Sequence, residues 1–519
     1  MKNKIGREIP DNIPGISNKK LYNGEFAYEP TGNIVGKKIR VGKPSTNKVL
    51  ASLEEAIDKT GLKNGMTISF HHHLRNGDYV IKIVMEAIAK KGLKDLTVAA
   101  SSLTDCHDFL VDYIEDGTVS AIETSGLRGV LGKYLTKNPG KLKRPVIIRP
   151  HGGRARAIEC GEVKIDVAFM GVPTCDRFGN ATGTQGKSAF GSLGYAMVDS
   201  RFAEQVVLVT DNLLTDDYVY PYSIPQIDVD YIVEVEEIGD PKGIASGALR
   251  LSTNPVQVIL AEYAAEVMDQ TGFIKEGFSV QMGSGGASLT AAKFIREKME
   301  QRNIKGSFGI GGSTGIFTQM LVDDLFEVFY DTQTFDIDAA KSMADNPRHL
   351  EISASHYANP WNPSPIVNDL DVVILSATEV DLDFNVNVIT DSNGVLMGAS
   401  GGHSDTAAGA KLSLIVVPLI RGRLPMILDQ VQHVITPGSS IDVIITERGI
   451  AVNPLRKDLL EKLKDSNLPI MTIQELQKMA YDMVGKPKEM EYSQDEKDIV
   501  AVIEYRDGSL LDVVRKPLG

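Results

Sequence analysis

The sequence contains an internal repeat at a spacing of about 210 residues, and this repeat restricts the possible fold more than any other feature. A shift of 205 places residues 166–182 on residues 371–387 without a gap. A shift of 212 places residues 62–70 on 274–282, and it also aligns the segments 225–232 and 437–444. The identical pairs include Asp166 and Asp371, Val167 and Val372, Asp176 and Asp381, and Asn180 and Asn385. Three matches in the same order predict a duplicated domain.

Short apolar runs alternate with helical patterns in both copies. Residues 66–70 and 206–210 are strand-like, and residues 47–60 and 79–90 have the spacing of amphipathic helices. This alternation is typical of parallel α/β sheets, with loops at the strand ends. The sequence therefore predicts an α/β protein with two similar open α/β domains.

The repeat also divides the chain. We expect residues 1–44, rich in Gly, Pro, Asn and Lys, to form an extended arm. The first domain is expected at residues 45–245 and the second at 246–455. Residues 456–519 are expected to form a helical segment and a hairpin, whose turn lies at Asp507-Gly508.

Composition favours a protein that handles small molecules. The net charge is −13 and no block of Lys and Arg occurs, so a nucleic-acid partner is not expected. The three cysteines lack a Cys-x-x-Cys pair, which argues against a disulfide framework or a zinc site and favours buried reduced thiols. No apolar stretch is long enough for a membrane span, and the first residues lack a signal-peptide pattern. We therefore expect a cytoplasmic protein.

Glu379 is the main candidate catalytic residue. It follows the apolar strand 372–375, whereas the other copy of the repeat has Thr174 at this place. The fold alone therefore does not require a carboxylate there. We expect Glu379 to point into the cleft between the two domains, beside the backbone N–H groups of Gly401 and Gly402. The alternative is a solvated glutamate on a loop.

Glycine- and serine-rich segments follow two neighbouring strands of the second copy. The first comprises Gly283, Ser284, Gly285, Gly286, Ala287 and Ser288, and the second comprises Gly311, Gly312, Ser313 and Thr314. Backbone N–H groups at such a helix start point at an anion. Neither segment has the spacing of a nucleotide-binding loop. These residues are therefore candidates for binding an anionic substrate, and a tight turn without a ligand remains the alternative.

A third glycine-rich loop contains Gly401 and Gly402, followed by His403. Its N–H groups are candidate oxyanion donors, and His403 is a candidate neutral donor. Two of the three loops also spell Gly-x-Ser-x-Gly, which raises the alternative of a serine hydrolase with Ser313 or Ser400 as nucleophile. No matching acid and histidine can be assigned from the sequence.

Three consecutive histidines, His71, His72 and His73, stand close to Arg75 at the end of a predicted strand. Three readings remain open: a buried hydrogen-bonded loop, a metal site, and recognition of a carboxylate or phosphate together with Arg75. Three consecutive side chains at a strand end cannot all face one ion, so no metal site is expected.

These motifs together resemble the CoA-transferase family. The similarity lies in Glu-Val-Asp-Leu at 379–382, Asn-Val-Asn at 385–387, the Gly-Gly loop, IDVIITERGIA at 441–451 and PTCDRFGNATG at 173–183. FHHHLRNGDYV at 70–80 and MGSGGAS at 282–288 are similar to the branch of this family that acts on citrate. The resemblance implies two open α/β domains with the active site in the cleft between them.

The resemblance also implies a reaction and its partners. An acetyl-thioester and citrate would give a citryl-thioester and acetate. The thiol would be that of CoA, or of a phosphoribosyl-dephospho-CoA arm on a small acyl-carrier subunit, with no cofactor bound covalently to this chain. A separate lyase subunit would then cleave the citryl group, so an oligomeric complex is expected.

The role of Glu379 stays open within this resemblance. Most family members with this Glu form a glutamyl-thioester, whereas the citrate branch is expected to pass directly through a citric-acetic anhydride. Three other functions remain as alternatives: a thioester hydrolase, a CoA-transferase for another carboxylate, and a non-catalytic scaffold for an acyl carrier.

Overall fold

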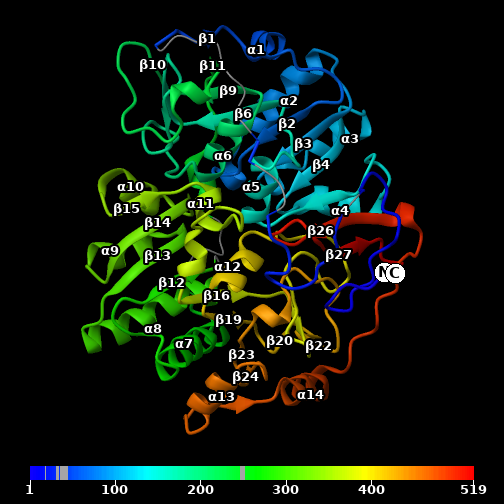
Figure 1. Cartoon of the computed structure of the whole chain (residues 1–519), viewed down its shortest axis with the longest axis vertical. Helices are drawn as coiled ribbons and strands as arrows, with labels where there is room; N and C mark the ends of the chain where they lie inside the picture. Colours follow the sequence, from blue (N-terminus) through cyan, green and yellow to red (C-terminus); the bar gives the residue numbers. More distant parts are fainter. Residues whose placement is uncertain (18, 31–33, 36–44, 246–251, 284, 519) are drawn as a thin grey trace.

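The computed structural model of the 519-residue chain describes all residues except 18, 31–33, 36–44, 246–251, 284 and 519. Two large, mostly parallel sheets dominate it, one for each copy of the repeat (Figure 1). The expected mixed α/β class with two similar halves is confirmed. None of the described helices is long and apolar enough to cross a membrane.

The first sheet has ten strands. In spatial order they are β1 (Val49–Leu50), β11 (Tyr231–Glu234), β9 (Gln205–Thr210), β6 (Val167–Val172), β2 (Thr67–Phe70), β3 (Leu96–Ala100), β4 (Val119–Thr124), β5 (Val146–Ile148), β26 (Ile499–Glu504) and β27 (Leu510–Arg515). Strands β2, β3 and β6 are almost wholly buried, which agrees with their continuous apolar runs.

The second sheet has nine strands. In spatial order they are β15 (His349–Glu351), β14 (Phe326–Thr334), β13 (Gly306–Ser313), β12 (Ser279–Met282), β16 (Val372–Ser376), β19 (Leu412–Val416), β23 (Val443–Thr446), β24 (Gly449–Val452) and β25 (Ile470–Met471). Short strands stand beside the two sheets: β7 (Thr174–Asp176), β8 (Ala181–Thr182), β10 (Leu213–Leu214), β17 (Glu379–Asp381), β18 (Val386–Asn387), β20 (Ile420–Arg421), β21 (Leu424–Pro425) and β22 (Ile427–Leu428).

Seven strands of the first sheet have equivalents, in the same spatial order, in the second sheet. The order β11-β9-β6-β2-β3-β4-β5 in the first matches β23-β19-β16-β12-β13-β14-β15 in the second. A shift of 212 residues relates β2 to β12 and β11 to β23, and a shift of 205 relates β7 to β17 and β8 to β18. The internal repeat seen in the sequence is therefore a repeat of topology.

Helices cover both sheets and fill the space between them (Figure 1). They are α1 (Leu53–Thr60), α2 (Val80–Lys90), α3 (Leu110–Glu115), α4 (Gly129–Lys137), α5 (His151–Glu159), α6 (Gly194–Phe202), α7 (Pro255–Gln270), α8 (Gly286–Arg302), α9 (Gly315–Val322), α10 (Ile337–Asp345), α11 (Ala354–Ala358), α12 (His403–Gly409), α13 (Lys457–Leu463) and α14 (Ile473–Val484). The helix expected at 47–60 begins only at Leu53, because Ser52 caps it and Val49–Leu50 pair with β11.

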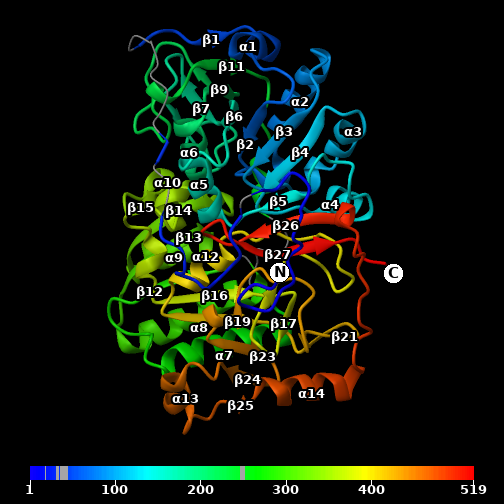
Figure 2. The same ribbon diagram turned by 45° about the vertical axis from the view of Figure 1, so that its right-hand side comes forward.

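The C-terminal hairpin completes the first sheet. Strand β26 pairs in parallel with β5, and β27 pairs antiparallel with β26 (Figure 2). Arg149, at the end of β5, donates from Nε to Glu504 at 2.8 Å and also pairs with Glu123. The tail thus crosses back from the second half and is fixed to the first by a buried ion-pair network.

The cysteines are free in the described part of the chain. Cys175 is buried, as expected for a reduced core thiol, whereas Cys106 and Cys160 are only partly buried. The expectation that all three are buried is therefore wrong for these two. No group of His, Cys, Asp and Glu that could hold a metal ion occurs among the described residues.

Candidate active site

A cleft of about 870 Å³ lies between the two halves. The first half lines it with His72, Arg75, Ser102, Thr104, Asp105, Ser125, Arg128, Gly129, Lys133, His151 and Tyr195. The second half contributes Gln281–Gly283, Gly285, Gly311, Gly312, Thr332, Gln333, Phe335, Tyr357, Leu375–Thr378, Val388, Asp391, Val395 and Met397–His403. Loops at the ends of parallel strands form much of this wall, as expected for an α/β sheet.

The glycine-rich segments of the second half come together at one edge of the sheet. Strands β13, β12 and β16 are neighbours in the sheet, so their ends lie side by side and bring Gly312, Gly283 and Ser376 to the cleft. Gly285 precedes the first turn of α8, where no side chain caps the helix. This places the positive end of a 17-residue helix at the cleft, which favours an anion.

Not every residue of the first segment reaches the cleft wall. Ala287 and Ser288 are buried in α8, and the hydroxyl of Ser288 lies 3.2 Å from that of Ser376. Gly286 begins the helix next to them. Ser284 lies outside the described residues.

The second glycine segment is part of a strand and not of a turn. Gly311, Gly312 and Ser313 belong to β13, with a β-bulge between the two glycines. The expected strand–turn arrangement is therefore wrong here, because the chain stays paired with β14 through Ser313. Thr314 follows as the first residue outside the strand, and its hydroxyl is buried without a hydrogen-bond partner.

Ser313 is not arranged as the nucleophile of a hydrolase. Its hydroxyl donates to Asp331, and Nε2 of His349 lies 3.0 Å from the same carboxylate. The carboxylate thus stands between the hydroxyl and the imidazole, whereas the serine triad needs the imidazole in the middle. Ser400 lines the cleft, and its backbone N–H donates to the Ser125 carbonyl of the first half.

The three histidines have different surroundings in the fold. His72 lines the cleft, and its Nδ1 lies 2.6 Å from the Ser101 hydroxyl. His71 and His73 face each other, with 2.8 Å between their Nδ1 atoms. Burial lowers the pKa of all three imidazoles. They are therefore neutral at pH 7, and two of them form a buried hydrogen-bonded pair.

Arg75 lines the cleft on the 3₁₀ turn that follows the histidines. Its backbone has a φ of 51°, and its guanidinium lies 5.2 Å from the ring centre of Phe335. Nη1 is buried without a hydrogen-bond partner. Burial, together with the charge of nearby Arg128, lowers the pKa of Arg75 to about 10. Arg75 is thus still charged at pH 7 and has donors to spare for an anion.

Glu379 lies behind the cleft wall. It is 1% exposed, and its Oε2 accepts a 3.1 Å hydrogen bond from Nδ2 of Asn387. Its neighbour Thr378 lines the cleft, whereas Glu379 is not among the described residues that do so. The expectation that Glu379 points into the cleft is therefore wrong. Glu379 of β17 lies directly opposite Asn387 of β18, and its carboxylate turns towards that amide instead.

Gly401 and Gly402 do line the cleft at the start of α12. A Cβ atom at Gly402 would lie 2.5 Å from the Tyr357 hydroxyl, so any larger residue there would displace the Tyr357 ring. His403 is neutral, because burial lowers its pKa to about 4. Both of its ring nitrogens already have partners, Thr436 at 2.7 Å and Ser376 at 3.1 Å. It is therefore not a spare donor.

Two cleft residues that the sequence analysis did not identify are Arg128 and His151. Each follows a strand of the first sheet, β4 and β5, by a few residues. Nδ1 of His151 is buried without a hydrogen-bond partner, and burial lowers the pKa of this residue to about 3. Ligands of parallel α/β sheets bind at the carboxyl ends of the strands, and both residues follow such ends in the first half, just as Gly283 does in the second.

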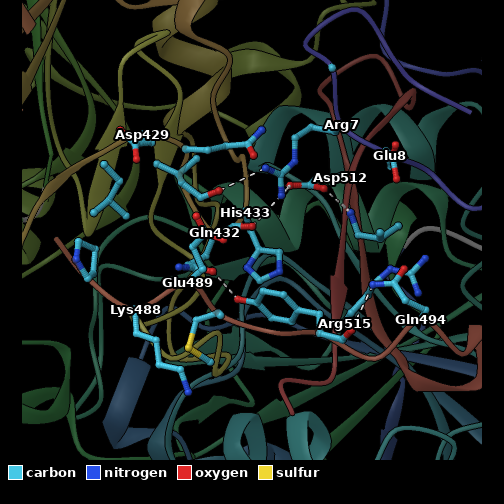
Figure 3. Close-up of a pocket in the computed structure, with 18 of the residues that line it drawn as sticks. Arg7, Glu8, Asp429, Gln432, His433, Lys488, Glu489, Gln494, Asp512 and Arg515 are labelled. Carbon is cyan, nitrogen blue, oxygen red and sulfur yellow. Dashed lines mark hydrogen bonds and ion pairs between the residues drawn. The ribbon is translucent and has the colours of Figure 1, made fainter. Parts of the chain in front are cut away.

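A second cavity, of about 710 Å³, lies where the two chain ends meet (Figure 3). Figure 3 shows Arg7 paired with Asp512, at a distance of 2.8 Å, and His433 at the centre of the cavity. Two of its three lysines, Lys2 and Lys486, also form ion pairs, with Glu8 and Asp429. Lys488 and Arg515 also line this cavity and form no ion pair among the described residues, so charge alone does not distinguish it from the cleft. The cleft is the better candidate for the active site because Arg75 and the glycine-rich strand ends of the second half meet there.

The family described as "Citrate lyase, alpha subunit (CitF)" matches residues 46–517 of the chain. The citrate lyase alpha chain of Klebsiella pneumoniae is 51% identical over 470 residues, which cover 90% of this chain and 91% of that one. The corresponding chain of Escherichia coli K12 is 49% identical over 474 residues, covering 91% and 92%.

Solved structures agree with these sequence matches. A crystal structure described as the alpha subunit of citrate lyase from Streptococcus mutans, in complex with citrate, has a TM-score of 0.95 and 50% identity. The match covers 100% of both chains. The alpha subunit of a malonate decarboxylase from Acinetobacter baumannii has a TM-score of 0.63 at 14% identity, and covers 85% of each chain. The latter likeness concerns the fold alone.

Proposed function

The chain belongs to the family of citrate lyase alpha subunits, and on this premise we propose that it is a citrate CoA-transferase. It exchanges acetate for citrate on a thioester, so that acetyl-thioester and citrate give citryl-thioester and acetate. The observation that carries this proposal is the relative bound to citrate, which is 50% identical over the whole chain.

The charges of the cleft support a polycarboxylate as substrate. Citrate carries three carboxylates, which require donors and cations where they are removed from water. Arg75 offers a guanidinium with a buried, unpartnered Nη1, and α8 presents its positive end at Gly285. A guanidinium binds a carboxylate through two parallel hydrogen bonds, which a neutral donor cannot match. We propose that citrate binds between Arg75 and His72 of the first half and the glycine-rich strand ends of the second half, at Gly283, Gly285, Gly311 and Gly312.

We propose that citrate attacks the thioester directly. One citrate carboxylate forms a bond to the acetyl carbonyl carbon, and the carbonyl oxygen becomes an oxyanion beside the N–H groups of Gly401 and Gly402. The thiolate leaves, which gives a citric-acetic anhydride. The same thiolate then attacks the citryl carbonyl carbon, and acetate leaves. No net proton or electron is consumed.

The carboxylates of the cleft favour this direct route over a glutamyl-thioester. Asp105 and Asp391 are the carboxylates among the described residues that line the cleft. Asp391 accepts from the backbone N–H groups of Asn393 and Val395 at 2.9 Å, and Asp105 is exposed at the rim. Glu379 lies behind Thr378. We propose that citrate itself supplies the nucleophile and that Glu379 orients the wall of the site.

The proposal extends to the partners. The thioester is carried by CoA or by the phosphoribosyl-dephospho-CoA arm of the citrate lyase gamma acyl-carrier chain. The citrate lyase beta chain then cleaves the citryl group, so this chain works within an oligomeric complex. We place this chemistry in the cytoplasm, which the free cysteines favour.

The test is to mix the purified chain with acetyl-CoA and to follow acetate and citryl-CoA by mass spectrometry, with and without citrate. We expect both products in equal amounts, and only when citrate is present. Loss of acetyl-CoA without citrate would instead indicate a hydrolase. Faster transfer to another carboxylate would indicate a different CoA-transferase, and binding without turnover would indicate a scaffold.

A further inference from the structure

Two arginines of the first half, Arg75 and Arg128, line the same cleft. Arg75 follows β2, and Arg128 follows β4 and immediately precedes α4. Among the residues that the structure describes, no carboxylate forms an ion pair with either guanidinium within 4.0 Å. The nearest acidic influence is Asp105, whose charge acts on Arg128 from the exposed rim.

The two guanidiniums are unfavourable neighbours by themselves. Burial lowers the pKa of Arg128, and burial plus the charge of Arg128 lowers that of Arg75. Two like charges in a partly desolvated site repel each other, and a guanidinium with an unsatisfied N–H adds a further penalty. An anion bound between the two guanidiniums would offset their repulsion and would also accept a hydrogen bond from the unsatisfied N–H. Such an arrangement therefore points to a binding site for an anion.

Hydrogen bonds hold the backbone of Arg75 in an unusual conformation. Its φ of 51° is in the left-handed region, which disfavours a long side chain. Its carbonyl accepts hydrogen bonds from the Thr104 hydroxyl and the Cys106 thiol, each at 3.3 Å. Asp78, which follows the same 3₁₀ turn, has its carboxylate 3.3 Å from Nε2 of His107. Strain that is maintained by surrounding contacts is typical of a functional position.

We propose that Arg75 and Arg128 form a clamp for a citrate carboxylate that does not react, and that this clamp selects polycarboxylates over acetate. The inference rests on the proposed function and specifies its substrate recognition. The reacting carboxylate has to lie away from the clamp, because an ion pair with a guanidinium stabilises a carboxylate and makes it a weaker nucleophile. It lies instead at the Gly283 and Gly401 end of the cleft.

The clamp also explains how product and substrate exchange. Acetate has a single carboxylate, and in the reaction that group occupies the reacting end of the cleft. Once acetate has formed, it makes no contact with Arg75 or Arg128 and is held only weakly. Citrate keeps two further carboxylates and gains the charged hydrogen bonds of the clamp. The site therefore binds citrate in preference to the acetate that it releases.

The test compares Arg128→Gln with Lys137→Gln. Lys137 is exposed in the last turn of the same helix, α4, and does not line the cleft, so it controls for the loss of one positive charge. Calorimetry measures the Kd for citrate, malate and acetate, and kinetics measure the KM for citrate and for acetyl-CoA. Thermal melting checks that each variant is folded.

We expect Arg128→Gln to raise the Kd and the KM for citrate about 10- to 100-fold, the range for losing a charged hydrogen bond. The acetate Kd and the acetyl-CoA KM should stay within about twofold, and Lys137→Gln should resemble the wild type. The preference for citrate over malate should fall. Guanidinium ion added to Arg128→Ala should restore part of the citrate affinity, which a merely structural role would not allow.

Two outcomes would overturn the clamp. One is an unchanged citrate KM in a folded Arg128→Gln protein. The other is a rise in the acetyl-CoA KM alone, which would assign the arginines to the phosphates of the CoA arm. If the wild type binds citrate and loses this binding on Arg128→Gln, but transfers no acyl group, the clamp stands and the proposed transferase function fails. The two ideas are thus tested separately.

Discussion

Asn387 donates from Nδ2 to Oε2 of Glu379 across the β17–β18 pair, at 3.1 Å. The same Nδ2 also lies 3.0 Å from the Thr390 hydroxyl, which in turn lies 3.0 Å from Nδ1 of His433. Thr390 precedes the loop whose residues Asp391 and Val395 line the cleft. The buried carboxylate thus anchors one wall of the site from behind.

This geometry predicts different outcomes for two substitutions of Glu379. Glu379→Gln keeps an acceptor for Asn387, so transfer from acetyl-CoA to citrate should stay within about tenfold of the wild type. Glu379→Leu leaves the buried amide of Asn387 with Thr390 as its remaining acceptor and should destabilise the protein by about 1–3 kcal/mol. Kinetics and urea unfolding measure both. A CoA adduct on Glu379, found by mass spectrometry after acetyl-CoA alone, would show that it is a nucleophile instead.

Arg75→Gly should separate stability from binding. Glycine adopts a φ of 51° without strain, which favours the variant by about 1–2 kcal/mol. Loss of the contact with Phe335 opposes this by a similar amount. The free energy of unfolding should therefore change by less than about 1 kcal/mol, whereas the citrate Kd should rise about 10- to 100-fold. Arg75→Lys, which keeps the charge but not the fork, should bind with intermediate affinity. Wild-type citrate binding by Arg75→Gly would make the residue purely structural.

Citrate should stabilise the protein more than a simple anion does. At about 100 times its Kd, a ligand specific for the folded state adds about 2.7 kcal/mol to the free energy of unfolding. Thermal melting in matched series of citrate, acetate and sulfate, at constant ionic strength, measures this. Equal shifts with sulfate and citrate would reduce the start of α8 at Gly285 to a general anion site.

Glu351 should make stability depend on pH. Burial raises its pKa to about 7, although the backbone N–H of Leu193 donates to it. The folded state therefore holds a proton between about pH 4.5 and 7 that the unfolded state releases, so stability falls as pH rises through this window. At pH 8 the raised pKa of Glu351 lowers the free energy of unfolding by an amount on the order of 3 kcal/mol, and Glu351→Gln should remove this loss. The plot of unfolding free energy against pH should then be flatter. Urea unfolding from pH 4.5 to 8 measures it, and a uniform effect at all pH values would contradict this assignment.

The hairpin β26–β27 should depend on the ion pair at its base. Glu504→Ala leaves the buried guanidinium of Arg149 with Glu123 alone and should cost about 3–5 kcal/mol. Lys497→Ala, on the exposed turn just before β26, is the control and should have little effect. Hydrogen exchange should rise first in β26 and β5. Equal exchange in wild type and Glu504→Ala would show that apolar packing alone holds the hairpin.

The sequence by itself determined the architecture of this protein. Apolar periodicity is local, and two copies of the same pattern fold into the same topology, so residues 62–70 and 274–282 predicted the equivalent strands β2 and β12. Glycines that directly follow a strand, such as Gly283, predicted the edge of the sheet that forms the cleft, because the carboxyl ends of parallel strands meet at that edge.

Only the tertiary structure decided which side chains face the cleft. Glu379 turns towards Asn387 on the neighbouring strand β18, and Arg75 and Arg128 reach the same cleft from two different strand ends of the first sheet. The same holds for β26, which pairs with β5 more than 350 residues earlier (Arg149 and Glu504 are 355 apart). Local patterns fix the strand or helix, but the direction of a polar side chain follows from non-local packing and from the need to satisfy buried hydrogen bonds.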